Sequence, residues 1–532
     1  MKRVVYALLF LQIAFPCFSQ FKRIAESPVF KEPEDGFAKL LHMKNGSTVY
    51  LHIDFKKGID VMIFDSLHHT KVNKAIEPGY NRSKKKSIEA VFEIGGDVVV
   101  MISEYDDRVP ALYRIIIDGA NGNVKGDAKI AELNKMTLGQ GYAMAFGGVP
   151  LPDFFIRKDP ASDYYALVML NSFEADRNKR LEVVWYGPDN KEVNRAFYSS
   201  PDNKYKYLVY IDMAVIGSQK VSVLAYAYNT AFSGGKESEL VMANLDAGAK
   251  DVTLDELPFS KDLIVKYGAT RYNPVTKKIL LLAAVQAGRK STEFNTVLAF
   301  IDPYDRKIGG VQPLYPKKVN AENVTLFGGR HEYTGVPQNI FVNADGSFSV
   351  VYEEVTNYTQ SGRDYSMEWS ELGSVAVCRY DPEGNELQSY LIPKNHFYYK
   401  YHLQPFYHSA REGSATELLD ANQYKSFAYL DGKSNSYLLF NDLEKNGEEA
   451  KRGKITTIRS VKECDGFYFL LDGTDILPER KFVFGAPDRK REHDLALYAI
   501  SDYDRDRDVY STLELDKEGR SKEVKVVWLQ PE

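Results

Sequence analysis

The sequence predicts an all-β protein, a β-propeller of seven or eight four-stranded blades. Aromatic residues make up 13% of the chain, with 36 Tyr and 29 Phe, and such residues favour strands. Helical periodicity is scarce. A unit of apolar runs, a polar loop, another strand and a tight Gly, Asp or Asn turn recurs along the chain. Units of this kind that repeat around an axis describe a propeller.

The clearest copy of the unit lies at 277–314. KKILLLAAV is a strand, QAGRKSTEFN a polar loop, TVLAFIDP a strand, YDRK a turn and IGGVQPL a strand. A short strand such as IEAVFEI precedes each full copy, which makes four strands per unit. Strands from both chain ends could complete one blade and avoid exposed edges, so seven blades remain an alternative to eight. The expected blades are 37–78, 87–133, 153–199, 205–258, 268–315, 337–393, 424–473 and 481–530.

The N-terminus has the pattern of a secretory signal. MKR is a short positive region, VVYALLFLQIAF is an apolar run, and PCFSQ allows cleavage after Ser19. Pro16 before Cys17 argues against a lipoprotein. No later apolar run could span a bilayer. We therefore expect a signal peptide at 1–19, one domain at 20–532, and a periplasmic or extracellular location.

The net charge and the cysteine content limit which partners and which cysteine sites the protein can have. The 532 residues carry a net charge of -5 without a polybasic tail, so we expect no nucleic-acid partner. After cleavage two cysteines remain, Cys378 and Cys464, and their spacing is not that of a metal site. They could form one disulfide or stay as two buried thiols.

SDYDRDRDVYSTL places aspartates at every second position, namely Asp502, Asp504, Asp506 and Asp508. The first three fit the oxygen positions of a calcium loop. Arg507 stands where such a loop needs glycine, and Leu513 where it needs an acid. Calcium binding and a solvated turn therefore both remain open, and no other cofactor is expected. We predict that this turn joins the second and third strands of the last blade.

Loops between the second and third strands should open on one face of a propeller. Each contains Arg or Lys, including Arg108 and Arg289, so a ring of cations could attract a carboxylate or an acidic partner. Mixed charge on exposed loops is the plainer interpretation. The longest of these loops, 356–373, carries candidate ligand-binding residues and candidate acids. The candidate ligand-binding residues are Tyr358, Arg363, Tyr365 and Trp369, and the acids are Asp364, Glu368 and Glu371.

Two segments between the sixth and seventh units interrupt the repeat. HFYYKYHLQPFYH holds His396, His402 and His408 among aromatics, and we interpret it as a linker on the rim rather than a metal site. SATELLDANQYK predicts a short helix, also on the rim, that Ser414 could cap.

The FSQ ending of the signal, the turns YDPEGN and LDKEGR, and the segment FAYLDGKSNSYLLFNDLEKN carry a resemblance. With its high Tyr content, the chain resembles uncharacterised exported β-propeller proteins of Bacteroidota-type bacteria. The resemblance implies a bacterial periplasmic or surface protein and a β fold. It implies no activity.

We therefore expect a non-catalytic binding or scaffold protein of the cell envelope, a monomer by itself. It would recognise an envelope protein or a glycan through its inter-strand loops. One alternative is a polysaccharide or peptide hydrolase or lyase that uses acids of the 356–373 loop. Another is a structural propeller stabilised by calcium. The chain contains no G-x-S-x-G, H-E-x-x-H or P-loop motif.

Overall fold

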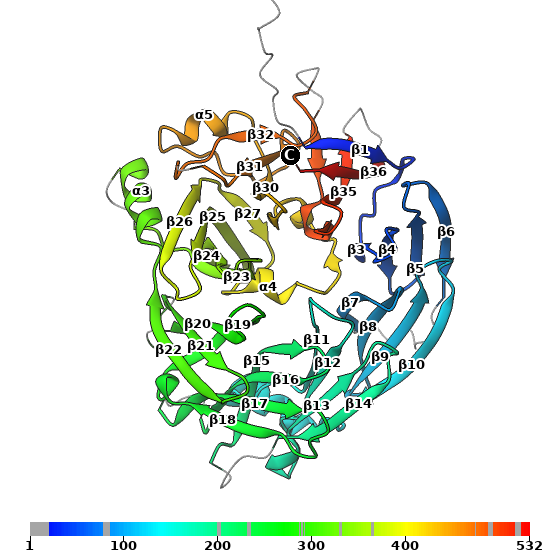
Figure 1. Cartoon of the computed structure of the whole chain (residues 1–532), viewed down its shortest axis with the longest axis vertical. Helices are drawn as coiled ribbons and strands as arrows, with labels where there is room; N and C mark the ends of the chain where they lie inside the picture. Colours follow the sequence, from blue (N-terminus) through cyan, green and yellow to red (C-terminus); the bar gives the residue numbers. More distant parts are fainter. Residues whose placement is uncertain are drawn as a thin grey trace, which may run out of the picture.

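A computed structural model describes residues 21–531 except 78–85, 199–203, 231–235, 287, 289, 290, 292, 329–331, 363–365, 474, 488–492 and 517–522. Within these residues the strands form eight separate antiparallel sheets, which stand around a common centre as in a propeller (Figure 1). The predicted all-β class is confirmed. The expected signal peptide and cleavage site lie outside the described residues.

Six sheets are built from four consecutive strands each. Five of them come first along the chain, and the earliest of these also pairs with the distant strand β28. Their strands are β3 (Phe37–His42), β4 (Thr48–Asp54), β5 (Gly58–Phe64) and β6 (Thr70–Ile76), with β28 (Thr416–Glu417); β7 (Lys86–Ile94), β8 (Asp97–Asp106), β9 (Val109–Asp118) and β10 (Val124–Glu132); β11 (Asp153–Lys158), β12 (Tyr165–Leu170), β13 (Leu181–Tyr186) and β14 (Glu192–Phe197); β15 (Tyr207–Ile216), β16 (Lys220–Tyr228), β17 (Ser238–Asp246) and β18 (Thr253–Leu257); β19 (Ile264–Asn273), β20 (Lys278–Gln286), β21 (Phe294–Asp302) and β22 (Lys307–Leu314).

Of the remaining three sheets, one follows the same plan and two contain additional strands. The strands are β23 (Val336–Val342), β24 (Phe348–Ser361), β25 (Ser366–Tyr380), β26 (Glu386–Ile392) and β27 (His396–Tyr399); β29 (Ala428–Asp431), β30 (Ser436–Asp442), β31 (Asp465–Leu470) and β32 (Arg480–Phe482); β33 (Asp494–Ala496), β34 (Asp502–Asp504), β35 (Val509–Asp516), β36 (Glu523–Gln530), β1 (Lys22–Glu26) and β2 (Phe30–Lys31). The described helices are α2 (Leu138–Gly147), α3 (Lys317–Phe327), α4 (Tyr407–Ala410), α5 (Asn446–Ala450) and the single-turn helices η2 (Arg177–Lys179), η4 (Pro258–Ser260), η5 (Asn422–Tyr424) and η6 (Tyr498–Ile500).

The first strand of a sheet lies nearest the centre of the ring and the fourth lies outside (Figure 1). Because neighbouring strands are antiparallel, turns from the first to the second strand all leave at one end of the sheets, which we call the turn face. Loops from the second to the third strand, and connections to the next sheet, leave at the opposite end, the loop face.

The core lies between the faces of neighbouring sheets. In β20, Leu280 and Leu282 are fully buried against β23 and β24, while Ile279 and Leu281 are fully buried against β16 and β17. A middle strand thus buries both faces, which explains why its sequence is continuously apolar instead of alternating. Each such Leu or Ile contributes roughly 1.5–3 kcal/mol of burial.

The last sheet combines the two chain ends. β1 pairs with β36, from Lys22 opposite Gln530 to Glu26 opposite Val527. Phe21, just before β1, packs on Tyr437 and Tyr468, with ring centroids 5.1 and 4.7 Å apart. The N-terminal strand therefore covers the outer edge of β36, an edge that would otherwise be open to pairing with another chain.

This arrangement corrects the predicted place of the aspartate turn. β1 is the outermost strand of its sheet, so β36 is third, β35 second and β34 belongs to the innermost part. The turn 504–509 therefore joins the first and second strands and lies on the turn face. The prediction placed it between the second and third strands because the sequence does not show that an N-terminal strand joins this sheet.

The segment between the sixth and seventh sheets is not on the rim, as predicted, but in the middle of the ring (Figure 1, α4). The Phe406 N–H donates to the Pro337 carbonyl of β23 at 2.8 Å, and the Gly413 carbonyl accepts from Val91 of β7 at 2.6 Å. β28 then pairs with β3. We call residues 396–418 the crossing segment. Ser414 caps no helix, since its hydroxyl donates to the Ile88 carbonyl at 2.7 Å.

Cys378 in β25 and Cys464 before β31 are both buried free thiols, so they do not form a disulfide. Burial raises the pKa of the Cys378 thiol to about 12, which makes it inert. Among the described helices, none has the length and apolar character needed to cross a membrane.

Candidate functional site

The sixth sheet extends into a two-stranded ribbon on the loop face. β23 pairs with β24 only as far as Glu353, and β26 pairs with β25 only as far as Val375. Beyond these residues β24 and β25 continue together to Ser361 opposite Ser366, with a bulge at their root. We call residues 354–372 the ribbon. It carries most of the loop that the sequence analysis singled out at 356–373.

One side of the ribbon carries stacked aromatic rings. Tyr358 lies directly opposite Trp369, and their centroids are 5.3 Å apart with ring planes at 13°. Phe397 of β27 stacks on the other side of Trp369 at 5.7 Å, and Arg459 lies over Phe397 at 4.8 Å. We call Tyr358, Trp369 and Phe397 the aromatic ledge. Tyr358 is 38% exposed and Met367, on the same side, 44%.

The other side of the ribbon is held by the crossing segment. The Asn357 side chain donates to the Leu403 carbonyl at 2.8 Å, and the Ser370 hydroxyl donates to the Tyr401 carbonyl at 2.8 Å. His402 Nε2 lies 3.0 Å from the Tyr358 carbonyl. These bonds, with the pairing of β27 to β25, fix the ledge in one orientation. A preorganised aromatic surface loses little conformational entropy when a ligand stacks on it.

The structure separates the predicted acids of the loop. Glu368 and Glu371 are three residues apart on a continuously paired strand, so their side chains leave opposite sides of the ribbon. They therefore do not form the facing carboxyl pair that glycoside hydrolysis needs. Three predicted residues of this loop, Arg363, Asp364 and Tyr365, lie outside the described residues.

Of the two cations predicted for neighbouring loops, Arg289 also lies outside the described residues. Arg108 is exposed in the tight turn between β8 and β9 and has a φ of 68°. Its carbonyl accepts from the Met136 N–H at 2.9 Å, which ties this turn to the chain just before α2.

The four aspartates of 502–508 point to different partners. Asp502 accepts from the His42 N–H at 2.6 Å, Asp504 forms an ion pair with Arg507, and Asp508 accepts from the Tyr503 hydroxyl at 2.6 Å. Asp506 is exposed. Despite burial, which raises it, the hydrogen bonds and charge of Arg507 hold the pKa of Asp504 below its usual value. Among the described residues no three acidic, His or Cys side chains are grouped as a metal would require.

The three histidines predicted to sit in a rim linker are also apart. His396 Nδ1 lies 3.0 Å from the Lys425 carbonyl, and His408 Nε2 lies 3.0 Å from the Phe427 carbonyl, while His402 contacts the ribbon. Burial lowers the pKa of His396 to about 3 and that of His408 to about 4. Both rings are therefore neutral, with His396 fully buried and His408 partly exposed.

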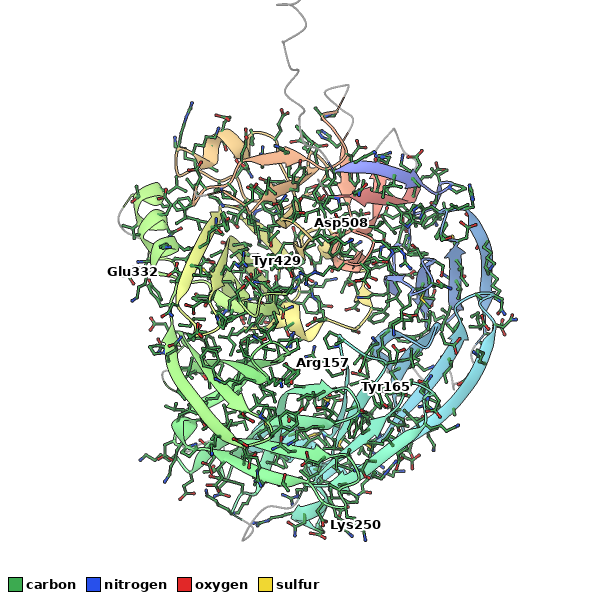
Figure 2. All side chains as sticks on the ribbon, in the orientation of Figure 1. Arg157, Tyr165, Lys250, Glu332, Tyr429 and Asp508 are labelled. Atoms are coloured by element: carbon green, nitrogen blue, oxygen red, sulfur yellow. The ribbon has the colours of Figure 1, made fainter. Side chains whose placement is uncertain are left out.

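A charge cluster that sequence reasoning missed lies in the middle of the ring, where Figure 2 labels Arg157. Arg157 of β11 and Arg271 of β19 each form ion pairs with Asp212 of β15 and with Glu412 of the crossing segment. Arg271 also donates to Asn339 of β23 at 2.8 Å. Two cations and two anions balance, so the cluster joins the innermost strands to the crossing segment without attracting an ion of its own.

A second missed feature is a pair of carboxyl groups on neighbouring inner strands. Glu89 occupies a bulge of β7, where it accepts from the Ser103 hydroxyl at 2.5 Å, and Asp153 begins β11. Burial, and then the charge of Glu89, raise the pKa of Asp153 to about 7. Burial also raises the pKa of Glu89. No sequence signal marks this pair, because 64 residues separate its members.

No protein-family model and no curated protein matches the chain. Three similar solved structures illustrate the likeness found. The lectin BP39L of Burkholderia pseudomallei is 12% identical, with 70% of this chain and 99% of that chain covered and a TM-score of 0.32. A protein of unknown function from Bacteroides caccae is 8% identical, with 67% and 80% covered and a TM-score of 0.25. The polysaccharide lyase Uly1 is 9% identical, with 86% and 93% covered and a TM-score of 0.36. Such low identities and TM-scores support no conclusion about activity, and the expected kinship with Bacteroidota-type proteins stays a prediction.

Proposed function

We propose that the chain is an exported, eight-bladed propeller of the cell envelope that binds a partner on its aromatic ledge and has no catalytic role there. One observation carries the proposal. A ribbon that projects from one sheet presents the exposed ring of Tyr358, which stacks on Trp369 and through it on the buried Phe397, and its other side is fastened to the crossing segment. Stacked rings on a rigid support suit the apolar face of a sugar ring or the side chains of a peptide.

Eight blades agree with the eight sheets found among the described residues, the last of which joins both chain ends. Export is supported by the signal pattern at 1–19. An exported binding protein needs neither a metal nor a redox-active cysteine, and both thiols here are buried.

The experiment places the mature protein, from Gln20 onward, on an array of envelope glycans and of peptides. Tyr358→Ala with Met367→Ala removes the two exposed large side chains of the ledge side. We expect the affinity for any captured probe to fall roughly tenfold or more, as for an interface anchor. The matched control is Tyr315→Ala with Leu387→Ala, because these side chains are 45% and 51% exposed elsewhere. Equal loss in both variants, or no loss in either, would contradict the proposal.

A second candidate function, cleavage of a polysaccharide or peptide by hydrolysis or elimination, rests on Glu89 and Asp153, which lie on the neighbouring inner strands β7 and β11. A carboxyl group with a pKa near 7 can serve as a general acid or base near neutral pH. The same arrays distinguish the two functions. Probe shortened by the wild type but not by Asp153→Asn would replace the binding proposal with the enzymatic one.

A further inference from the structure

The helix α2 is apolar, exposed and charge-free. Leu138, Tyr142 and Phe146 recur at every fourth position and are 76%, 69% and 74% exposed, and Leu151 after the helix is 52% exposed. From Met136 to Pro152 the chain contains no charged residue, although 27% of the whole chain is charged. The rings of Tyr142 and Phe146 stack at 6.2 Å, so one face of the helix is an apolar stripe, and the exposed Leu151 follows it in the same connection.

This helix is firmly built and yet buries nothing. Thr137 and Gln140 form a capping box at its start, and Gly148 closes its end with a left-handed backbone. Its flanks are anchored, because Met136 and Val149 are buried and the Tyr228 hydroxyl donates to the Gly148 carbonyl at 2.7 Å. None of its own residues is buried, whereas α3, α4 and α5 each bury at least one.

An ordinary surface helix keeps its apolar stripe against the core and its polar side toward water. In α2 the large apolar side chains face away from the core instead. The residues on its other sides are mostly Gly and Ala, so the helix has no charged side to offer water. Leaving these apolar side chains in water costs free energy of solvation, which indicates that another surface covers the stripe.

The size and chemistry of the patch decide which surface that is. A stable second copy or protein partner buries about 800 Å² on each side and makes several hydrogen bonds. Four side chains from one connection fall short of such an area. Their only polar side-chain atom is the Tyr142 hydroxyl, and the Gln140 side chain is already engaged in the capping box. A bilayer needs neither a minimum area nor hydrogen-bond partners, since each apolar side chain can insert by itself.

We propose that α2 attaches this protein to the surface of a lipid bilayer, with Leu138, Tyr142 and Phe146 inserted among the acyl chains. The backbone polar groups of α2 are satisfied by its helical bonds and caps, as insertion requires. The helix lies on the loop face, because it connects the outermost strand β10 to the next sheet. Arg108, exposed beside Met136, is in place to meet lipid phosphates. This proposal does not depend on the ligand of the aromatic ledge.

The test is flotation of the mature protein with vesicles of phosphatidylcholine alone and with vesicles of three parts phosphatidylcholine to one part phosphatidylglycerol. The variant replaces Leu138, Tyr142 and Phe146 by Ser. The matched control replaces Val193, Phe197 and Leu387 by Ser, because these are 51%, 41% and 51% exposed on outer strands. We expect the wild type and the control to float, and the α2 variant to bind at least about tenfold more weakly.

Two further measurements separate a loss of membrane binding from a loss of folding and test insertion directly. The α2 variant should melt at the temperature of the wild type, since the replaced side chains bury nothing in the protein. In Tyr142→Trp, vesicles with brominated acyl chains should quench the added fluorescence. Failure of the wild type to float with either vesicle, equal flotation of the α2 variant, or a wild-type dimer that this variant abolishes would each overturn the proposal. If the wild type binds only the anionic vesicles and the α2 variant keeps this binding, the contact belongs to Arg108 and its neighbours. This outcome would also overturn insertion.

Discussion

Two connections on the loop face each join the outermost strand of one sheet to the next sheet, yet one lies on the surface and the other in the middle of the ring. Residues 133–152 form α2, which stands on the surface with its largest side chains in solvent. Residues 393–427 enter the middle of the ring and contact β3, β7, β19 and β23. The same position in the repeat thus supports either an outward docking element or an internal brace.

The difference lies in the polar side chains. The crossing segment brings Tyr407, which donates to the buried Glu353, and Glu412, which forms ion pairs with Arg157 and Arg271. Tyr407 thus meets a partner from β24, and Glu412, although 42% of its side chain is exposed, meets arginines of the innermost strands β11 and β19. In the α2 connection residues 136–152 carry no charged group, and the only charged residue of the connection, Lys135, forms an ion pair with Asp107. The internal connection therefore differs from α2 in having polar side chains that find partners, and not in being more apolar.

The largest expected effect comes from breaking the brace. Arg271→Ala leaves the buried Asp212 and the Glu412 carboxylate with Arg157 alone, and we expect the free energy of unfolding to fall by about 3–5 kcal/mol. Thermal or urea denaturation measures the loss. Arg195→Ala is the control, because Arg195 forms ion pairs with Glu182 and Glu192 at the surface and its side chain is 41% exposed. That change should cost less than about 1 kcal/mol. Similar losses in the two variants would show that the cluster is no brace.

Acid should weaken the crossing segment selectively. The pKa values of His396 and His408 are lowered by burial to about 3 and about 4, below the ordinary value in the unfolded chain. Unfolding therefore takes up protons, so this contribution to stability is complete above about pH 6.5 and is lost as the pH falls toward 4. For His408 the loss reaches roughly 3 kcal/mol.

The measurement is the melting temperature at pH 7 and at pH 4.5 for the wild type and for His408→Gln. We expect a smaller fall in the variant, because its amide does not titrate. The serine variant of α2 should fall like the wild type, since 136–152 contains no titratable side chain apart from Tyr142. Identical pH dependence in wild type and His408→Gln would contradict a buried neutral imidazole.

The smallest effect is expected at the aspartate turn. The side chains of Asp502, Asp504 and Asp508 already have separate protein partners, so we expect calcium and chelator to leave the melting temperature unchanged. Asp504→Ala should cost about 1 kcal/mol, because Arg507 is 43% exposed and loses one surface ion pair and one backbone hydrogen bond. A stabilisation by calcium that Asp504→Ala removes would restore the calcium interpretation of DYDRDRD.

Much of the fold could be predicted because strand signals are local. Alternation and turn residues are enough to mark the unit at 277–314, where the structure has β20, β21 and β22. The aromatic pair Tyr358 and Trp369 could be found as rings on the longest loop. Contacts distant in sequence could not be found in this way. Glu412 meets Arg271 across 141 residues, and β1 meets β36 across the whole chain.

One prediction failed, and one helix was not foreseen, for a related reason. SATELLDANQYK has the composition of a capped helix, but tertiary contacts override that propensity: Thr416 and Glu417 pair as a strand with β3, and only Asn422–Tyr424 forms a single helical turn. LGQGYAMAFG is rich in glycine, which is a poor helix former, and it nevertheless forms α2 because both of its ends are capped. Neither outcome could be read from local propensity alone.

Hydrogen exchange of the mature protein, alone and with vesicles of phosphatidylcholine and phosphatidylglycerol, tests the contrast between the two connections most directly. We predict slow exchange at 406–418 under both conditions, as expected of an internal brace. Residues 138–147 should exchange much faster without vesicles and become protected when vesicles are added. Exchange at 406–418 as fast as in α2, or no change in α2 with vesicles that bind the protein, would contradict the account.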